Sequence, residues 1–207
     1  MLSATQPVHQ YHSRSKPWHA RHRPYPTSQP SKKSQSTAPK QPNTYNRCWD
    51  WIVTGGNCHY AKNRATFRSY RRAPGKIGGS RVLGVGSVEL RVRRGSEDER
   101  TNTLVLNDVL HMPNARCNGL SLPKYQDANP LSGVDDEGEH FQAKSEDGSE
   151  PLWYTEEFRG LSRVVLAGQP QGESVLKDSE NCTPSVTASD EELEKLWQRV
   201  QNRSLVG

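Results

Sequence analysis

An alternation of apolar and charged residues limits what this chain can fold into more than any other feature. Val88, Leu90 and Val92 are each followed by a charged residue, in the stretch Val-Glu-Leu-Arg-Val-Arg. Successive side chains of a β-strand point to opposite faces, so this period of two gives the strand one apolar and one charged face. The pattern predicts a half-buried strand over residues 82–93.

A second strand is predicted over residues 103–110, because apolar residues are dense there and Pro113 follows them. The charged segment between the two strands, residues 94–102, predicts a hairpin loop and therefore an antiparallel pair. Further strand candidates follow at a spacing of roughly 10–20 residues, which is typical of an all-β barrel or sandwich. The additional strand candidates are residues 51–54, 140–144, 152–154 and 161–167.

Three segments between these strands are predicted to be less regular. Residues 60–68 suit a short helical turn that carries Phe67. Residues 71–80 are rich in Gly and Pro, which predicts a mobile, turn-rich loop. Residues 117–125 are predicted to form a short strand or a turn.

One α-helix is predicted, over residues 189–203. Ser189 and Glu192 have the spacing of a capping box, in which each side chain satisfies a backbone N–H of the other residue. The apolar residues that follow recur at helical spacing and form one stripe, which we expect to dock on the folded body. The stripe consists of Leu193, Leu196, Trp197 and Val200.

The N-terminal part of the chain differs from the rest in charge. Residues 1–49 contain eight Lys and Arg and no Asp or Glu, so subtracting these eight charges from the net +5 leaves −3 for residues 50–207. Apolar side chains are isolated within residues 1–47, and such a segment cannot offset the entropy cost of its own ordering. We therefore expect a basic, disordered tail over residues 1–47.

Basic residues alternate with aromatic ones in this tail, which would allow it to neutralise phosphates and to stack on unpaired bases. Weak nucleic-acid binding by the tail is one hypothesis, and a solvated basic linker is the other. The candidate nucleic-acid contacts are Arg14, Lys16, Arg21, Arg23, Lys32 and Lys33.

Hydropathy and cysteine spacing argue against several classes of protein. The longest apolar run is the four residues 164–167, whereas a membrane-spanning helix needs about 20 apolar residues and a signal-peptide core about 7 to 15. We expect an intracellular protein of the cytoplasm or nucleus, with no signal peptide, no transmembrane segment and no membrane partner. The four cysteines form no C-x-x-C pair, which predicts reduced thiols. We expect no metal site and no cofactor.

The strand at 51–54 ends in the turn Thr-Gly-Gly-Asn, and several enzyme families place a catalytic group at such a strand end. Thr54 would need a base within reach to act as a nucleophile, and His59 lies five residues further along. Cys58 is adjacent to His59, but adjacent side chains of an extended segment point apart. The turn also lacks the spacing of a phosphate-binding P-loop. A catalytic carboxylate would suit this position best.

Four sequence blocks follow one another within about residues 49–125: DWIVTGGNCHYAKNRATF, VLGVGSVELRV, LVLNDVLHMP and ARCNGLSLPKY. Their order and spacing resemble the retropepsin-like β-barrel segment of copia-type retrotransposon Pol polyproteins. The resemblance implies a small, closed, mostly β barrel. It also implies an aspartic peptidase mechanism, in which two carboxylates activate water and each subunit of a homodimer supplies one of them.

The resemblance places the catalytic carboxylate of that family on Thr54 of this chain. The following Ser/Thr, Gly and Ala positions of the family fall on Gly55, Gly56 and Asn57. A threonine hydroxyl does not ionise near neutral pH, so it can neither take a proton from water nor share one. We therefore expect a degenerate loop at residues 54–57, no catalytic residue and no enzyme activity.

Asp50 and Asp108 are the other candidates for the missing carboxylate. Asp50 lies four residues upstream of Thr54, which is about 13 Å along an extended strand and too far to enter the turn. Asp108 falls in a part of the family pattern that is structural. Neither residue is expected to restore the chemistry.

These inferences predict four regions: a tail over residues 1–47, a barrel core over 48–125, additional strands and loops over 126–188, and a helix over 189–203. We expect a non-catalytic, retrotransposon-derived protein whose barrel is an interaction scaffold or a relic. Two alternatives stay open, an active homodimeric aspartic endopeptidase and nucleic-acid binding through the tail. A homodimer would form through the barrel, and the sequence names no protein partner.

Overall fold

The computed structural model describes residues 47–131, 134–135, 141–168, 170, 172–176 and 184–204. All of these belong to one compact unit. The predicted tail, with its six candidate nucleic-acid contacts, lies outside the described residues except for residue 47. Cys182 also lies outside them.

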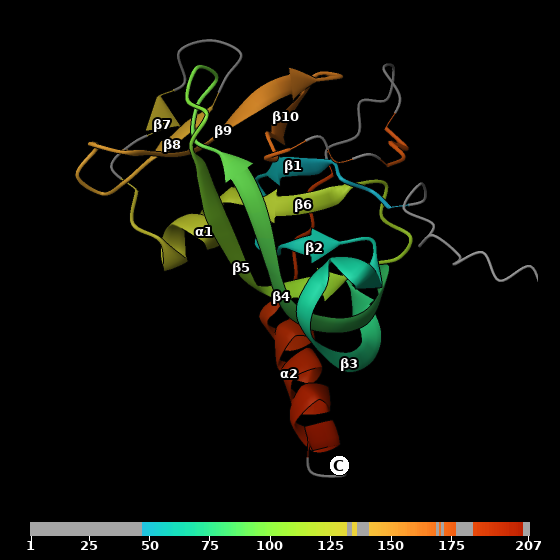
Figure 1. Cartoon of the computed structure of the whole chain (residues 1–207). Helices are drawn as coiled ribbons and strands as arrows, with labels where there is room; N and C mark the ends of the chain where they lie inside the picture. Colours follow the sequence, from blue (N-terminus) through green and yellow to red (C-terminus); the bar gives the residue numbers. More distant parts are fainter. Residues whose placement is uncertain are drawn as a thin grey trace, which may run out of the picture. The chain divides into compact units, whose positions relative to one another are not determined.

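The described chain is mostly β (Figure 1). Its strands are β1 (Trp51–Thr54), β2 (Tyr60–Ala61), β3 (Phe67–Ile77), β4 (Ser80–Arg93), β5 (Thr101–His111), β6 (Asn118–Ser121), β7 (Val134–Asp135), β8 (Gln142–Lys144), β9 (Pro151–Phe158) and β10 (Leu161–Val164). Two α-helices, α1 (Leu122–Ala128) and α2 (Asp190–Ser204), and a 3₁₀ turn at Arg64–Thr66 complete the described elements.

The strands form one open sheet in the order β3-β4-β5-β2-β6-β1-β10-β9-β8-β7, so β3 and β7 are its edges. The expectation of a closed barrel is therefore wrong. A barrel needs a continuous ladder between its first and last strands, whereas among the described residues a single isolated bridge, Val92 to Leu166, joins β4 to the segment after β10. Two backbone hydrogen bonds flank that bridge, from the Arg93 N–H to the Val165 carbonyl and from the Ala167 N–H to the Arg91 carbonyl.

The central hairpin agrees with the sequence. Strands β4 and β5 are antiparallel, and the charged loop between them spans residues 94–100. Val88, Leu90 and Val92 are buried, and Glu89 and Arg91 are exposed. The alternation of apolar and charged residues thus identified the face of β4 that packs into the core.

Segment 71–80, predicted as a mobile loop, is instead part of a long hairpin between β3 and β4. Pro74 has no N–H to donate, but β3 is an edge strand and its register shifts between Arg72 and Gly75, so no ladder hydrogen bond is required there. Only Gly78 and Gly79 form the turn, with φ of +54° and +75°. Such left-handed conformations favour glycine.

The two other irregular segments were predicted only in part. Within residues 60–68 the 3₁₀ turn spans Arg64–Thr66, while Tyr60–Ala61 and Phe67 belong to strands. Residues 118–121 form the strand β6, and the helix α1 follows directly. Ser121 caps α1 by accepting a hydrogen bond from the Lys124 N–H.

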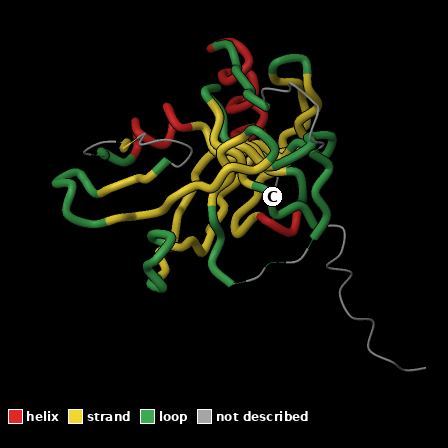
Figure 2. The backbone as a smooth tube through the Cα atoms, turned by 90° about the horizontal axis from the view of Figure 1, so that it is seen from above, coloured by secondary structure: helices red, strands yellow, loops and turns green. Residues whose placement is uncertain are grey.

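Two apolar clusters lie on opposite faces of the sheet at β1. Ile52 belongs to one cluster, with Tyr60, Val82 and Leu110, and Trp51 belongs to the other. Both side chains are fully buried. Residues 51–53 of the strand are all apolar, as expected where both faces of a strand are covered. Seen from above, the strands gather in the middle of the fold (Figure 2).

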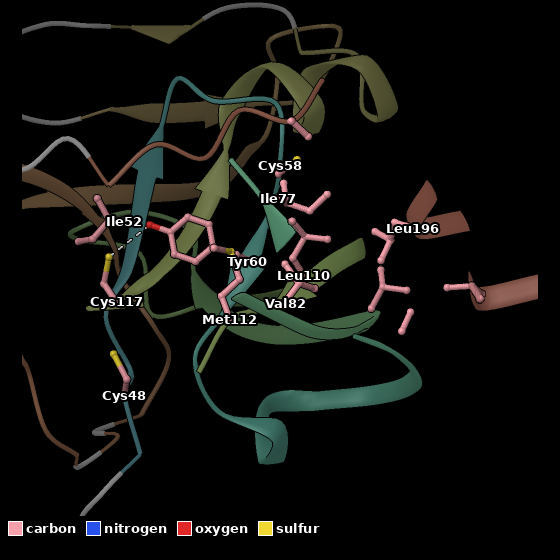
Figure 3. Packing of buried hydrophobic residues seen from close by; sticks show 14 of the residues in the cluster. Cys48, Ile52, Cys58, Tyr60, Ile77, Val82, Leu110, Met112, Cys117 and Leu196 are labelled. Atoms are coloured by element: carbon pink, nitrogen blue, oxygen red, sulfur yellow. Dashed lines mark hydrogen bonds between the residues drawn. The ribbon is translucent and has the colours of Figure 1, made fainter. Parts of the chain in front are cut away.

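Helix α2 closes the first of these clusters. The Ser189 N–H donates to Glu192 Oε2 at 3.1 Å and the Glu192 N–H donates to Ser189 Oγ at 3.3 Å, which is the predicted capping box. Leu196 and Val200 are buried, and Leu196 points toward Val82 and Leu110 (Figure 3). The predicted apolar stripe therefore docks on the body. In the part of the chain that is described, no helix is both long and apolar enough to cross a membrane.

The turn after strand β1 as a candidate functional site

The turn at residues 54–57 is positioned by β6. Strands β1 and β6 run parallel, with Thr54 opposite Ser121. Thr54 is buried, and its Oγ1 donates a hydrogen bond to the Leu120 carbonyl at 3.4 Å. The hydroxyl thus fastens the end of β1 to its neighbour.

Ser121 holds the turn from the β6 side. Its Oγ donates a hydrogen bond to the Gly56 carbonyl. Its backbone N–H donates to Nδ1 of His59 at 3.0 Å. Because the same Oγ accepts from the Lys124 N–H, one serine joins the turn to the start of α1.

A segment far along the chain, residues 184–188, covers one side of the turn, while Gly55 and Asn57 are exposed. Asn57 Nδ2 donates to the Ala188 carbonyl at 2.9 Å, and the Ala188 N–H donates to Asn57 Oδ1 at 2.8 Å. The Cys58 N–H donates to the Val186 carbonyl at 3.3 Å. The Tyr60 hydroxyl donates to the Pro184 carbonyl. We call residues 184–188 the covering segment.

Gly56 is required by this covering segment. A Cβ placed on Gly56 would lie 2.8 Å from the backbone carbon and nitrogen of Val186 and still closer to its carbonyl oxygen. A Cβ on the neighbouring Gly55 would meet nothing within 4 Å. The two glycines of the turn therefore have different roles, since only Gly56 permits the close approach of another backbone.

The titratable groups next to the turn do not favour proton transfer. Burial lowers the pKa of His59 to about 3, and the positive charge of Lys124 acts in the same direction. His59 is neutral at physiological pH, and its Nδ1 accepts the Ser121 N–H. Burial raises the pKa of the Cys58 thiol, whose Sγ donates to Asn57 Oδ1 at 3.3 Å. A thiol with a raised pKa is a poor nucleophile.

Asp50 is engaged by an ion pair of its side chain, whereas the hydrogen bond of Asp108 involves its backbone. Asp50 lies before β1, and its Oδ1 accepts a hydrogen bond from Arg163 Nη1 at 3.2 Å. Asp108 has a left-handed φ of +53°, at the point where the register between β4 and β5 shifts. Its carbonyl accepts a hydrogen bond from Lys124 Nζ at 3.4 Å. Among the described residues, the hydrogen bonds of the Thr54 and Asn57 side chains and of the Gly56 carbonyl involve backbone groups or neutral side chains.

A pocket of about 340 Å³ lies away from the turn. Asp50, Glu156 and Arg163 line it, together with residues 164–166, and none of residues 54–57 does. Arg163 joins the two carboxylates, with Nη2 at 2.6 Å from Glu156 Oε1. The turn therefore does not open into this pocket.

Sequence reasoning found the turn and missed what covers it. The predicted strand end is occupied by Thr54, Gly55, Gly56 and Asn57. The contacts of this turn with Val186 and Ala188 join residues that are far apart in the sequence, and Asn57 and Ala188 are 131 positions apart. No periodicity or motif reports a contact of that range. Where the structure is described, three or more His, Cys, Asp or Glu side chains do not come together in a metal-binding group. Among the described residues, Cys48, Cys58 and Cys117 are buried and form no disulfide.

Comparison with known proteins identifies a matching family for part of the chain. Residues 51–130 match the family model described as the Pol polyprotein, beta-barrel domain. The matched residues include the turn, the β4–β5 hairpin, β6 and α1. No curated protein and no solved structure matches the chain. The match supports a domain derived from a retrotransposon Pol polyprotein.

Proposed function

We propose that this protein is a non-catalytic interaction scaffold, built on a degenerate copia-type, retropepsin-like domain. The observation that carries the proposal is the double hydrogen bond between Asn57 and Ala188, which ties the covering segment onto the turn. A catalytic turn must leave room for water and a peptide between its reacting groups. Here the backbone of the same chain fills one side of that position.

The chemistry of the turn supports the same proposal. An aspartic peptidase needs two carboxylates that share one proton. Thr54 offers a hydroxyl that is already donated to the Leu120 carbonyl. Asp50 is the nearest carboxylate along β1, and its ion pair with Arg163 holds it before the strand. A homodimer that brought two such turns together would still lack both carboxylates.

We expect the full chain to cleave no peptide between pH 4 and pH 7. The assay is a library of decapeptides whose cleavage is detected by mass spectrometry, with Thr54→Ala as the matched variant. Residual cleavage from a contaminating serine, cysteine or metallopeptidase would be equal in both proteins and would not respond to a statine-type transition-state analogue. Cleavage by the wild-type chain that this analogue blocks would contradict the proposal.

The companion variant Thr54→Asp/Gly55→Ser distinguishes the effect of the missing carboxylate from the effect of the covering segment on access to the turn. If only the carboxylate is missing, this variant should gain activity that the statine-type analogue inhibits. If the covering segment also blocks the turn, the variant should remain inactive, and this is the result we expect. An active variant would leave the wild type non-catalytic but would refute the blocking role of residues 184–188.

A further inference from the structure

The hairpin formed by β3 and β4 carries an unusual concentration of positive charge. Residues 62–81 contain seven Lys and Arg and no Asp or Glu. Five cations gather along β3, at the end of the hairpin and on the adjacent face of α2: they are Arg71, Arg72, Lys76, Arg81 and Arg199. We call these five residues the hairpin basic surface.

The pairing of the strands brings these charges close together. Lys76 lies directly opposite Arg81 in the antiparallel register. Arg199 reaches the same end of the hairpin from α2, since its Cζ would lie 3.2 Å from a Cβ placed on Gly75. Like charges directly opposite each other destabilise a sheet. The fold therefore maintains an arrangement that costs stability.

Nearby carboxylates do not neutralise this surface. All five cations are exposed, and among the described residues none of them forms an ion pair or a side-chain hydrogen bond. Glu89 pairs with Arg68. Glu192 accepts hydrogen bonds from the backbone N–H groups of Gly78 and Ser189. All five charges are open to solvent.

We propose that the hairpin basic surface binds the phosphodiester backbone of a single-stranded nucleic acid. Four of its five cations are arginines, whose planar guanidinium groups match phosphate oxygens in pairs. β3 is an edge strand on the rim of the fold (Figure 1), so a long chain can run along it. The cations are spread over both faces of β3 and the end of the hairpin, which suits a flexible polyanion with many charges better than a single anion.

A stacking platform lies beside these charges. The guanidinium of Arg64, itself exposed, lies over the ring of Tyr70, with its Cζ 4.0 Å from the ring centroid. The Tyr70 hydroxyl is hydrogen-bonded to Nδ1 of His111 at 2.9 Å, which fixes the ring. Unpaired bases stack on aromatic rings and on guanidinium planes, and Arg64 and Tyr70 offer one of each next to the cations. This platform favours single strands over duplexes.

The inference is independent of the state of the turn, because it uses none of residues 54–57. It also differs from binding by the tail, because the cations belong to the folded part of the chain. A different explanation of the charges is that they protect the edge strand from pairing with another molecule. That explanation predicts aggregation when the charges are removed and no change in the affinity for nucleic acid.

The test uses the full chain and three triple variants that each remove three positive charges. The hairpin variant is Arg72→Gln/Lys76→Gln/Arg81→Gln. The control in the folded part is Arg94→Gln/Arg100→Gln/Lys195→Gln, whose three cations each have a carboxylate partner within the chain. The control in the tail is Arg14→Gln/Lys16→Gln/Arg21→Gln. Thermal melting verifies that each protein is folded.

Binding is measured by fluorescence anisotropy with a labelled mixed-sequence single-stranded 20-mer, as RNA and as DNA, from 50 to 300 mM NaCl. We expect the hairpin variant to bind at least tenfold more weakly at 100 mM NaCl. The slope of log K against log salt should fall by about 2, since each lost phosphate contact removes about 0.7. The folded-part control should change the affinity less than threefold, and the duplex of the same sequence should bind more weakly.

Four results would overturn the proposal. The first is that the wild type does not bind the single strand at 50 mM NaCl. The second is an equal loss of affinity in the hairpin variant and in the folded-part control, and the third is a loss of affinity confined to the tail variant. The fourth is that polyglutamate binds as tightly as the single strand. Aggregation of the hairpin variant with unchanged affinity would favour the edge-protection explanation instead.

Discussion

Gly56→Ala should lower the free energy of unfolding by about 3 kcal/mol, because an added Cβ must displace the backbone of the covering segment. The clash involves the Val186 backbone carbon and nitrogen at 2.8 Å and, more closely, the carbonyl oxygen. Backbone cannot rotate away as a flexible side chain can. Moving the covering segment would also strain the hydrogen bonds of Asn57 and Cys58.

Gly55→Ala is the matched control, because it makes the same chemical change one residue earlier. Gly55 is exposed and has no atom within 4 Å of a Cβ position. We expect it to change the stability by less than about 1 kcal/mol, with a small gain where alanine restricts the unfolded chain. Urea denaturation of both variants gives the comparison. Equal effects of the two substitutions would contradict the close packing of residues 184–188 on the turn.

A second large effect should come from His59 in acid. Burial lowers its pKa in the folded protein to about 3, against an ordinary value of 6.5. Between these two pH values the unfolded chain binds a proton that the folded chain does not bind. The free energy of unfolding therefore falls as the pH falls from 6.5 toward 3. At about 1.4 kcal/mol per pH unit, the loss from pH 7 to pH 4 is about 3 kcal/mol.

His59→Asn isolates this contribution. The asparagine oxygen can accept the Ser121 N–H in place of Nδ1, and it does not titrate. The variant loses ring packing at every pH, so the quantity to compare is the slope of stability against pH. We expect the wild type to lose about 3 kcal/mol more than the variant between pH 7 and pH 4. Burial also lowers the pKa of His111, which remains in both proteins. Parallel curves would show that His59 is not held neutral.

The sequence predicted the elements whose local pattern and tertiary environment agree. The alternation in β4, the apolar β1 and the capping box of α2 each reflect a face that the structure buries or a backbone group that it satisfies. The hairpin of β4 with β5 followed from the loop between them. These features depend on residues within a few positions of each other.

The parts of the fold that were not predicted depend on the tertiary environment, which local sequence patterns do not report. Strand β3 was missed because Pro74 and its neighbouring glycines indicate a turn, and an edge strand tolerates a residue without an N–H. The open sheet was missed because the strand count and spacing are the same in open and closed forms. The positive charge of residues 62–81 can be counted in the sequence, but it was not recognised because residues 50–207 as a whole have a net charge of −3.

The covering segment was not predictable from the sequence by this reasoning. Residues 184–188 contain no motif, and their role arises only when the chain brings them beside Gly56 and Asn57. The resemblance to a peptidase loop directed attention to the turn. The contacts that close the turn were found only in the three-dimensional structure.

The central claim is that the turn is a closed structural joint, and amide hydrogen exchange of the native protein tests it most directly. The Cys58 N–H is bonded to the Val186 carbonyl, and the Ala188 N–H is bonded to Asn57 Oδ1. If the joint is closed, both amides should exchange as slowly as that of Leu110, which is bonded to the His59 carbonyl within the core. Exchange of Cys58 and Ala188 at the rate of the exposed Gly79 amide, with Leu110 still protected, would contradict the account.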